Sequence, residues 1–488
     1  MTTNMITLYT PATGFPDLEI KIAYGLARVG IEAGSKPQIV PQKGFYQVNY
    51  NDCSLNKANR SFLTILKCLL TSARFYDLGV KAKDKTKYPA KEETIKRIEN
   101  LLNRNDMANL FSPKSVSNFN MKRNKFCGHE DIESFGGRTG LILLSSSHAG
   151  KPYFRDKRYD TFNLSLCNIC GYLAVLGLYS FCFIIQMGIG KNRKYAVILP
   201  IPEKELTTGD LHMLLALQKT LHNFWLSDVQ PLRAFTIGLL AKVPSISDII
   251  NDLQLYFHLS LVSKDNRGTV IEQTASIDAI PFSKFISSSP YNSATVNKLL
   301  GSSKIPPRIS SLIEITNILE QCGKSNLPKF ARLYVQETST NNFTNLLYPD
   351  TSKYLLKEVA MISCEIIENP ALVSLAKTLR YFIREKKYGY ADDIRNARKE
   401  SRVFEETIAK MLREGELRRV QQEQDKKQGK KIENWIHLPN EQEIKEVFKL
   451  ANEDFESTKT ALVILAFSFP SRVEKEDVET DEEVENAK

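Results

Sequence analysis

Two pairs of cysteine and histidine residues in the middle of the chain have the spacing of metal ligands. The first pair is Cys127 and His129, and the second is Cys167 and Cys170, which form a Cys-x-x-Cys turn. Zn²⁺ prefers four sulfur or imidazole ligands in a closed tetrahedron, and a Cys-x-x-Cys turn supplies two of them with a backbone geometry that forms readily. The sequence therefore predicts a zinc site made of these four residues, within a Cys/His segment at 126–202.

The first pair leaves alternatives open, because Cys-x-His is an irregular spacing for a zinc-binding pair. His148 or Glu130 could replace one of its members. The four residues could also be ordinary buried side chains, a common fate of free cysteine. If a metal is bound, we expect its role to be structural, because no neighbouring residue looks like a general base serving an open coordination position.

Basic residues gather close to these ligands in the sequence, and aromatic residues such as Phe126, Tyr153 and Tyr195 lie among them. Cations bind phosphates, while flat rings stack on bases or wedge between them. This part of the chain is therefore predicted to bind nucleic acid. The candidate residues are Lys122, Arg123, Lys125, Arg155, Lys157, Arg158, Lys191, Arg193 and Lys194.

Residues 352–472 have the periodicity of a helical bundle. Asn369 followed by Pro370 predicts a helix start, because asparagine caps and proline fits the first helical position. Apolar residues three and four apart predict a second helix over 394–411. Asn440 and Glu443 form a capping-box pattern that predicts a third helix, and a fourth is predicted over 459–469.

The first two of these helices each carry a basic stripe beside the apolar face. A basic stripe can simply be a solvated helix face. Two stripes in succession with few acids among them favour a track for phosphate groups. The residues concerned are Lys377, Arg380 and Arg384 on the first helix, and Arg395, Lys399 and Arg402 on the second.

Residues 171–189 contain no charged side chain and are long enough to suggest a transmembrane helix. Glycines and the polar Ser180 and Gln186 interrupt the segment, and its Phe and Ile residues at 181–185 favour a strand. We predict instead a short helix from Cys170 that leads into a buried hairpin, with the second strand at 195–199. No membrane contact is expected.

The net charge is +10, and it is unevenly distributed. Residues 473–488 contain eight acids and two lysines, a charge of −6, so the rest of the chain carries +16. Such a surplus favours a polyanionic partner, although it can also serve solubility alone. Scattered cysteines and the lack of a signal-peptide pattern at the start predict a cytoplasmic protein.

The fold class predicted is α+β. We expect an N-terminal mixed domain over 1–335, with a zinc-ribbon-like insertion and a β-hairpin, then a C-terminal helical bundle over 352–472 and an acidic disordered tail over 473–488. Residues 287–308, rich in serine with three prolines, are predicted to be a loop or linker.

The sequence Tyr390-Ala391-Asp392-Asp393 matches the palm motif of reverse transcriptases, in which carboxylates on a hairpin hold two metal ions. Charged residues precede the motif and a predicted helix follows it, so its acids fit better as first-turn residues facing the positive end of a helix dipole. We therefore expect no enzyme. A palm-type polymerase or nuclease using Asp392 and Asp393 is kept as an alternative, as is a structural assembly protein.

Two segments resemble a known family. The run from Cys167-Asn168-Ile169-Cys170 to Ala174, followed by an apolar hairpin, is similar to the zinc-ribbon region of the large subunit of type I CRISPR Cascade complexes. The segment 388–398 with its helices looks like the terminal bundle of that subunit. The family usually has two Cys-x-x-Cys pairs, and Cys127 with His129 departs from this pattern.

The resemblance implies a non-catalytic subunit of a complex guided by CRISPR RNA (crRNA) in antiviral defence. Such a subunit would recognise the target-adjacent motif in double-stranded DNA, stabilise the R-loop, and recruit a helicase-nuclease. Its partners would be crRNA, target DNA, the other Cascade subunits and the helicase-nuclease, and its cofactor a structural Zn²⁺. The residues themselves support only nucleic-acid binding through basic surfaces.

Overall fold

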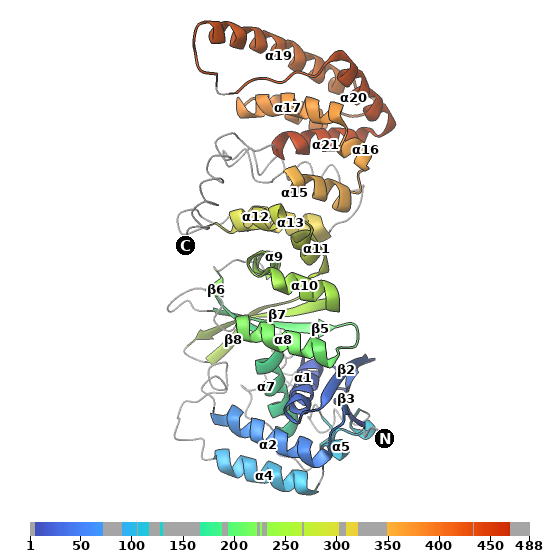
Figure 1. Cartoon of the computed structure of the whole chain (residues 1–488), viewed down its shortest axis with the longest axis vertical. Helices are drawn as coiled ribbons and strands as arrows, with labels where there is room; N and C mark the ends of the chain where they lie inside the picture. The colour runs from blue at the N-terminus through green and yellow to red at the C-terminus, as the bar shows by residue number, and fades with distance from the viewer. Residues whose placement is uncertain are drawn as a thin grey trace, which may run out of the picture. The chain divides into compact units, whose positions relative to one another are not determined.

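The structure is a computed structural model, and it describes residues 5–71, 90–104, 106–116, 127–129, 166–187, 194–221, 225–226, 232–265, 268–301, 309–320, 349–432 and 434–468. The chain forms two compact units (Figure 1). Unit 1 consists of Met1–Leu232 and Asp248–Ile280, and unit 2 of Arg233–Ser247 and Pro281–Lys488.

Unit 1 is an α+β unit. Its elements are β1 (Ile6–Tyr9), α1 (Pro16–Glu32), β2 (Lys36–Gln42), β3 (Phe45–Asn51), α2 (Leu55–Thr71), α4 (Ala90–Arg104), α5 (Met107–Leu110), α6 (Pro113–Val116), α7 (Asn168–Phe181), β4 (Phe183–Met187), β5 (Lys194–Pro202), α8 (Thr208–Leu221), β6 (Trp225–Leu226), β7 (Leu255–Asp265) and β8 (Gly268–Asp278). Helix α10 (Pro244–Leu253) is divided between the two units.

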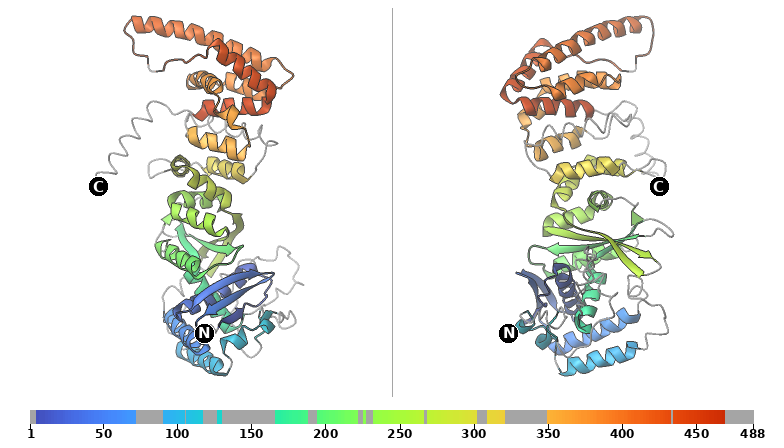
Figure 2. Two further views of the ribbon diagram at one scale, coloured as in Figure 1. Left: turned by 45° about the vertical axis from the view of Figure 1, so that its right-hand side comes forward. Right: turned by 180° about the vertical axis from the view of Figure 1, so that it is seen from behind.

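The strands of unit 1 form two sheets. One is antiparallel with the order β1-β3-β2, and α1 lies against it. The other has the order β6-β4-β5-β7-β8 and is antiparallel except for the pairing of β4 with β6. Its strands β7 and β8 make a long ribbon (Figure 2). The antiparallel bridge between Ile39 and Leu206 joins β2 to the chain that follows β5.

Helices α1 and α7 cross with their backbones in contact, and two glycines make this possible. A Cβ atom on Gly25 of α1 would lie 2.1 Å from the carbonyl oxygen of Leu173, and one on Gly177 of α7 would lie 2.0 Å from that of Lys21. Nearby, the ring of Tyr24 stacks on Phe181 at 4.8 Å, and its hydroxyl donates to the carbonyl of Pro200 at 2.8 Å. Both helices are therefore core elements.

The predicted helix and hairpin after Cys170 are confirmed. Helix α7 ends at Phe181, and β4 then pairs with β5 from Phe183 opposite Ile198 to Met187 opposite Lys194. None of the helices in the described part of the chain combines the length and the apolar character that a membrane crossing requires.

Unit 2 is helical in its described residues. Its elements are α9 (Leu232–Lys242), α11 (Ile280–Ser288), α12 (Pro290–Leu300), α13 (Ile309–Glu320), α15 (Pro349–Tyr354), the π-helical turn η4 (Leu355–Val359), α16 (Cys364–Ile367), α17 (Pro370–Arg384), α18 (Gly389–Asn396), α19 (Val403–Lys427), α20 (Glu441–Glu453) and α21 (Phe455–Ser468). The first residues of α9 and α11 belong to unit 1.

Helix α21 is the centre of the C-terminal helices, because it is buried on all sides and contacts α15, α16, α17, α18 and α20. The predicted helix starts around it are confirmed. The Asn369 side chain accepts from the backbone N–H of Ala371 at 2.9 Å, with Pro370 at the first helical position. Asn440 and Glu443 form the reciprocal capping box at the start of α20.

Two predictions about elements of unit 2 were wrong. Residues 394–411 are not one helix, because α18 ends at Asn396 and α19 begins at Val403. The apolar residues of both helices nevertheless face inward, which explains the continuous periodicity in the sequence. Residues 287–308 are not only a loop, since Pro290 opens α12 and Ser289 caps it by accepting from the N–H of Tyr291 at 3.2 Å.

The α+β class, with sheets in the N-terminal part and helices in the C-terminal part, is as predicted. The compact units place α11, α12 and α13 together with the C-terminal helices, whereas the prediction extended the N-terminal domain to residue 335. The predicted acidic tail over 473–488 lies outside the described residues.

Replacing Gly25 by alanine is expected to destabilise unit 1. Alanine would favour the helix by roughly 0.5–1 kcal/mol, but its Cβ would collide with the backbone of α7, and overpacking costs about 1–3 kcal/mol or more. Urea unfolding followed by circular dichroism measures the difference. Gly209→Ala on α8 is the matched control, because its Cβ would meet nothing closer than 3.7 Å. Equal stability of the two variants would contradict the close crossing.

Candidate metal centre

The Cys167–Cys170 pair is positioned by the start of α7. Cys167 is the N-cap residue, and its sulfur accepts a hydrogen bond from the backbone N–H of Cys170 at 3.3 Å. The first intrahelical hydrogen bond runs from the Gly171 N–H to the Cys167 carbonyl at 2.9 Å. This cap geometry places both thiols on the same side of the helix terminus, where the helix dipole favours a thiolate.

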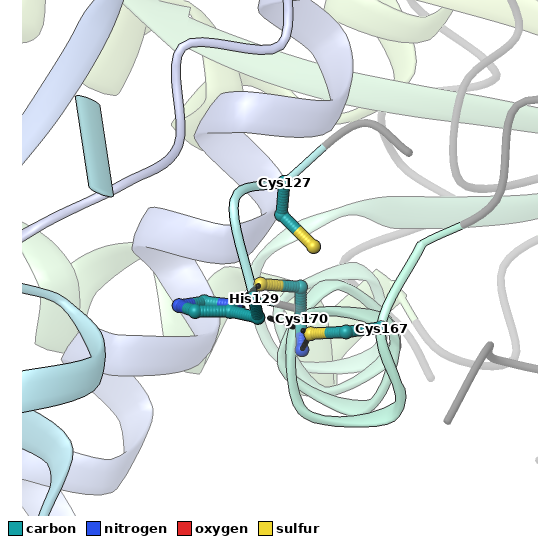
Figure 3. Close-up of side chains that lie close together, drawn as sticks. All are labelled: Cys127, His129, Cys167 and Cys170. Atoms are coloured by element: carbon teal, nitrogen blue, oxygen red, sulfur yellow. Dashed lines mark hydrogen bonds between the residues drawn. The ribbon is translucent and has the colours of Figure 1, made fainter. Parts of the chain in front are cut away.

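Cys127 and His129 converge on this pair from a separate segment (Figure 3). The Nδ1 atom of His129 lies 3.3 Å from the sulfur of Cys167 and 3.4 Å from the sulfur of Cys170. The four potential ligand atoms all lie within 4.8 Å of one another. The four residues predicted as zinc ligands are therefore brought together.

These distances suit a tetrahedral metal ion. Zn–S bonds of about 2.3 Å and Zn–N bonds of about 2.0–2.1 Å place a sulfur and a nitrogen about 3.6 Å apart, and two sulfurs about 3.8 Å apart, at tetrahedral angles. The two measured separations from His129 Nδ1 are within a few tenths of an ångström of that value. An ion could be bound with small movements of the side chains.

The histidine is held in the tautomer that a metal ligand needs. Its Nε2 atom lies 2.7 Å from the carbonyl oxygen of Leu110, and because a carbonyl oxygen only accepts, Nε2 carries the hydrogen. Nδ1 is thereby the nitrogen that points at the sulfurs of Cys167 and Cys170. A hydrogen bond from the second ring nitrogen to a backbone carbonyl is the usual outer-shell support of a metal-binding histidine.

The residues behind His129 are tied to the sheet of β1. The ring of Phe111 meets the imidazole edge to face at 5.4 Å. The Phe111 carbonyl accepts from the N–H of Tyr9 at 2.7 Å, at the end of β1. Asp106 caps α5 by accepting from the N–H of Asn109 at 2.9 Å, which fixes the turn that presents Leu110. The site therefore joins α7, the segment 127–129 and the end of α5 with the residue that follows it.

Burial and mutual contacts shift the acidity of all four groups. Hydrogen bonds from Cys167 and Cys170 hold the pKa of the Cys127 thiol well below its usual range. Burial raises the pKa of Cys167 and of Cys170. Burial by itself would lower the pKa of His129, but the charge of Cys167 and hydrogen bonds to Cys127 and Cys167 raise it well above its usual value. These shifts favour a thiolate at Cys127 and the protonated form at the other three residues.

The centre is closed to solvent. Cys167 and Cys170 are fully buried, Cys127 is 3% exposed and His129 is 8% exposed. Four protein ligands complete a tetrahedron, so no coordination position is left for a substrate. Such a site can stabilise a fold but does not perform metal-assisted hydrolysis. The alternative ligands His148 and Glu130 lie outside the described residues.

Most basic residues predicted near the metal ligands also lie outside the described residues. This applies to Lys122, Arg123, Lys125, Arg155, Lys157, Arg158, Lys191 and Arg193. Lys194 is described as the first residue of β5, and its Nζ atom forms an ion pair with Glu272 of β8 at 2.7 Å. Its charge is thus compensated within the sheet.

The basic stripes of unit 2 are only partly on the surface. Arg380 is 3% exposed and donates to the carbonyl of Phe467 at 3.4 Å, so its assignment to a phosphate-binding surface was wrong. The cause is α21, which covers the side of α17 that carries Arg380. Arg384 is half-buried and donates to the Asn434 side chain at 3.3 Å. Arg395 pairs with Asp392 at 3.0 Å.

Three of the predicted cations of unit 2 are exposed, namely Lys377, Lys399 and Arg402. Lys377 lies on α17, Lys399 lies between α18 and α19, and Arg402 is the residue before α19. The Nζ atom of Lys399 donates to the carbonyl of Asn452 at 3.3 Å. The predicted second stripe is therefore spread over a helix end and a turn.

The residues that resemble a palm motif lie on a helix. Asp392 and Asp393 belong to α18, and Asp392 is in its first turn, as expected. The hydroxyl of Tyr390 donates to Glu414 of α19 at 2.6 Å, which Lys387 also contacts. The motif residues thus connect α18 with α19, and they do not sit on a strand turn.

Sequence reasoning missed the outer-shell residues Leu110 and Phe111. Leu110 contributes through its backbone carbonyl, which every residue type possesses, so no sequence signal could have identified it. Phe111 is an apolar residue near the end of a short helix, and nothing in its type indicates contact with an imidazole.

No protein-family model matches the sequence, and a search of curated proteins found no match either.

Replacing Cys170 by serine is expected to remove bound metal from the purified protein, because a tetrahedral site loses one of its thiolates. Elemental analysis by mass spectrometry gives the metal content per chain. Cys182→Ser is the matched control, since Cys182 is another fully buried cysteine at the opposite end of α7 and is not part of the cluster. Identical metal content in the two variants would show that the cluster is not the binding site.

Proposed function

We propose that Cys127, His129, Cys167 and Cys170 bind a structural Zn²⁺ ion. The observation that carries this proposal is the orientation of His129, whose Nε2–H is held by Leu110 while Nδ1 faces two cysteine sulfurs. Three sulfurs and one imidazole nitrogen in a tetrahedral arrangement are a donor set that zinc binds in structural sites. Hard cations such as Mg²⁺ and Ca²⁺ prefer oxygen ligands.

The ion would contribute folding free energy by holding together parts of the chain that are distant in sequence. The segment 127–129 stands about forty residues before α7, and in the described residues the two meet at the cluster. The Cys170 N–H bonded to the Cys167 sulfur, and the Leu110 carbonyl bonded to His129, would orient the ligands.

We further propose that the chain is a non-catalytic nucleic-acid-binding subunit, similar to the large subunit of a type I CRISPR Cascade complex. Three features support this role: the resemblance of 167–174 and 388–398 to that family, the charge of +16 outside the acidic C-terminal segment, and exposed cations on unit 2. The closed metal centre agrees with a role without catalysis.

In this proposal, guide RNA pairing reads the target sequence, while this subunit recognises the adjacent duplex motif, stabilises the R-loop and recruits a helicase-nuclease. The exposed Lys377, Lys399 and Arg402 would contact phosphates. A palm-type polymerase has less support, because Asp392 lies on a helix and pairs with Arg395.

Removing zinc with a chelator is expected to loosen unit 1 locally. The bound ion would connect segments that are distant in sequence, in place of direct packing between them. Hydrogen exchange followed by mass spectrometry should then speed up at residues 127–129 and 167–171. The buried helix α21 in unit 2 is an internal control and should not change. Adding Zn²⁺ back, but not Mg²⁺, should restore protection. Unchanged exchange at 167–171 would argue against a structural role.

Purification from the native host is expected to recover bound RNA derived from CRISPR repeats, identified by sequencing. In a binding titration with DNA, affinity should fall with salt, because cations that bind phosphates release counterions. The triple variant K377Q/K399Q/R402Q should lower the slope of log K against log salt by roughly 0.7–0.9 for each phosphate that it no longer neutralises.

The charge-matched control is K357Q/K445Q/K449Q. Each of these exposed lysines pairs with a neighbouring glutamate, so its removal should affect DNA binding little. Recovery of the protein without repeat-derived RNA would count strongly against a Cascade role. Binding that does not respond to salt, or no binding at all, would favour an assembly protein that does not contact nucleic acid.

A further inference from the structure

The chain that returns from α19 to α20 runs back beside α19 (Figure 1). Side chains of α17 and α19 bind its backbone. The buried amide of Gln422 on α19 donates to the carbonyl of Asn434 at 2.7 Å and accepts from the N–H of Ile436 at 3.1 Å. It therefore pairs with the backbone on both sides of Trp435, as a neighbouring strand would. From α17, Thr378 donates to the carbonyl of His437 at 2.7 Å.

This arrangement fixes Trp435 with its side chain partly in solvent. Side chains alternate along an extended segment, and Ile436 is 6% exposed while Trp435 is 41% exposed. Between residues 421 and 468, Trp435 is the one large apolar side chain among the described residues that is this exposed. A rigid, exposed indole loses little conformational freedom when it binds a partner.

Four lysines lie close to Trp435 in the sequence, and one of them contacts its ring. Lys426 and Lys427 end α19, and Lys430 and Lys431 follow the turn at Gly429, whose φ of 77° is in the left-handed region. All four lysines are exposed, and the Nζ atom of Lys426 lies 5.5 Å from the centre of the Trp435 ring. Lys430 pairs with Asp425 at 2.8 Å, and in the described part of the chain no ion pair engages the other three.

We propose that Trp435 and Lys426, Lys427, Lys430 and Lys431 bind a single-stranded nucleic acid, with one base stacked on the indole and the ammonium groups on the adjacent phosphates. This inference rests on the proposed nucleic-acid-binding function. Flat rings beside cations are the general means of holding unpaired strands without reading their sequence. In a duplex, the base faces are already stacked and cannot reach the ring.

The structure favours a strand over a lipid surface at this place. Side chains that insert into a membrane interface do so as a broad apolar face. Trp435 stands near four exposed lysines, whereas Ile436 and Leu438 turn toward Gly415 on α19. Two further exposed apolar residues of α19, Leu417 and Val420, are separated by the exposed Arg418 and Arg419. The charged groups therefore outnumber the apolar ones.

The test begins with the variant Trp225→Phe, which leaves Trp435 as the single tryptophan, because the chain has two. An oligothymidylate of about twelve nucleotides, within the usual site sizes, should quench its fluorescence. Inorganic polyphosphate, which carries the charge without bases, should bind with little quenching. Vesicles of phosphatidylserine and phosphatidylcholine should leave the emission maximum unchanged.

Two substitutions of the indole separate stacking from simple apolar contact. Affinity for a labelled oligothymidylate is expected to fall on the order of tenfold to a hundredfold in Trp435→Leu, as for the loss of one stacked base. Trp435→Phe, which keeps a flat ring, should retain most of the affinity. Urea unfolding curves that coincide for the two variants show that the difference is not a folding defect.

The lysines are tested by K426Q/K427Q/K430Q/K431Q, which should lower the salt slope by roughly 0.7 for each phosphate left without its lysine. The control K445Q/K449Q removes two exposed lysines of α20 that pair with glutamates, and it should leave the slope unchanged.

The outcomes distinguish this inference from the broader proposal. If the protein binds oligothymidylate in a salt-dependent manner but neither Trp435 nor the lysines affect binding, the site proposed here is wrong and the nucleic-acid function stands. If no nucleic acid binds under any of these conditions, both the site at Trp435 and the proposed nucleic-acid-binding function are wrong. A blue shift of Trp435 emission with vesicles and none of the expected quenching with oligonucleotides would overturn the assignment in favour of a membrane surface.

Discussion

The arrangement of unit 1 depends on the contact between the backbones of α1 and α7. Gly25 and Gly177 face the opposing main chain so closely that even a methyl group would overlap a carbonyl oxygen. Helices that approach this closely cannot shift along one another without opening voids, because protein interiors are densely packed. The position and direction of α7 follow from this contact, and so does the position of the thiols at its first turn.

The Cys/His cluster connects the segment 127–129 to this contact, because two of its four residues lie at the start of α7. Cys167 and Cys170 belong to a helix that packs against α1, whereas Cys127 and His129 come from a segment about forty residues earlier in the chain. In the described residues, His129 contacts the sulfurs of Cys167 and Cys170, the Leu110 carbonyl and the Phe111 ring. A bound ion would therefore act mainly on the local stability of this region, since four ligands leave it no open position for chemistry.

In unit 2, lysine and arginine residues occur both buried between helices and exposed on the surface. Arg380 and Lys459 are buried and donate to main-chain carbonyls, of Phe467 at 3.4 Å and of Ala397 at 2.8 Å, so they satisfy helix ends around α21. Lys377, Lys399 and Arg402 remain on the surface, as do the lysines near Trp435. Which cations could meet a polyanion is therefore decided by the packing of α21 and of the 434–439 segment, because these cover some faces of α17 and α19 and leave others open.

The sequence by itself determined the α+β class, the hairpin after α7 and the caps at Asn369 and Asn440, and it pointed to the four residues that form the Cys/His cluster. These are local signals, set by hydrophobic periodicity, by capping chemistry and by the geometry of Cys-x-x-Cys. Only the tertiary structure decided that the helix expected over 394–411 is broken, that Arg380 is internal, that Leu110 orients His129 and that Trp435 is held outward by Gln422. Each of these depends on contacts between residues far apart in the chain, often through backbone atoms that all residues share, and no local pattern records them.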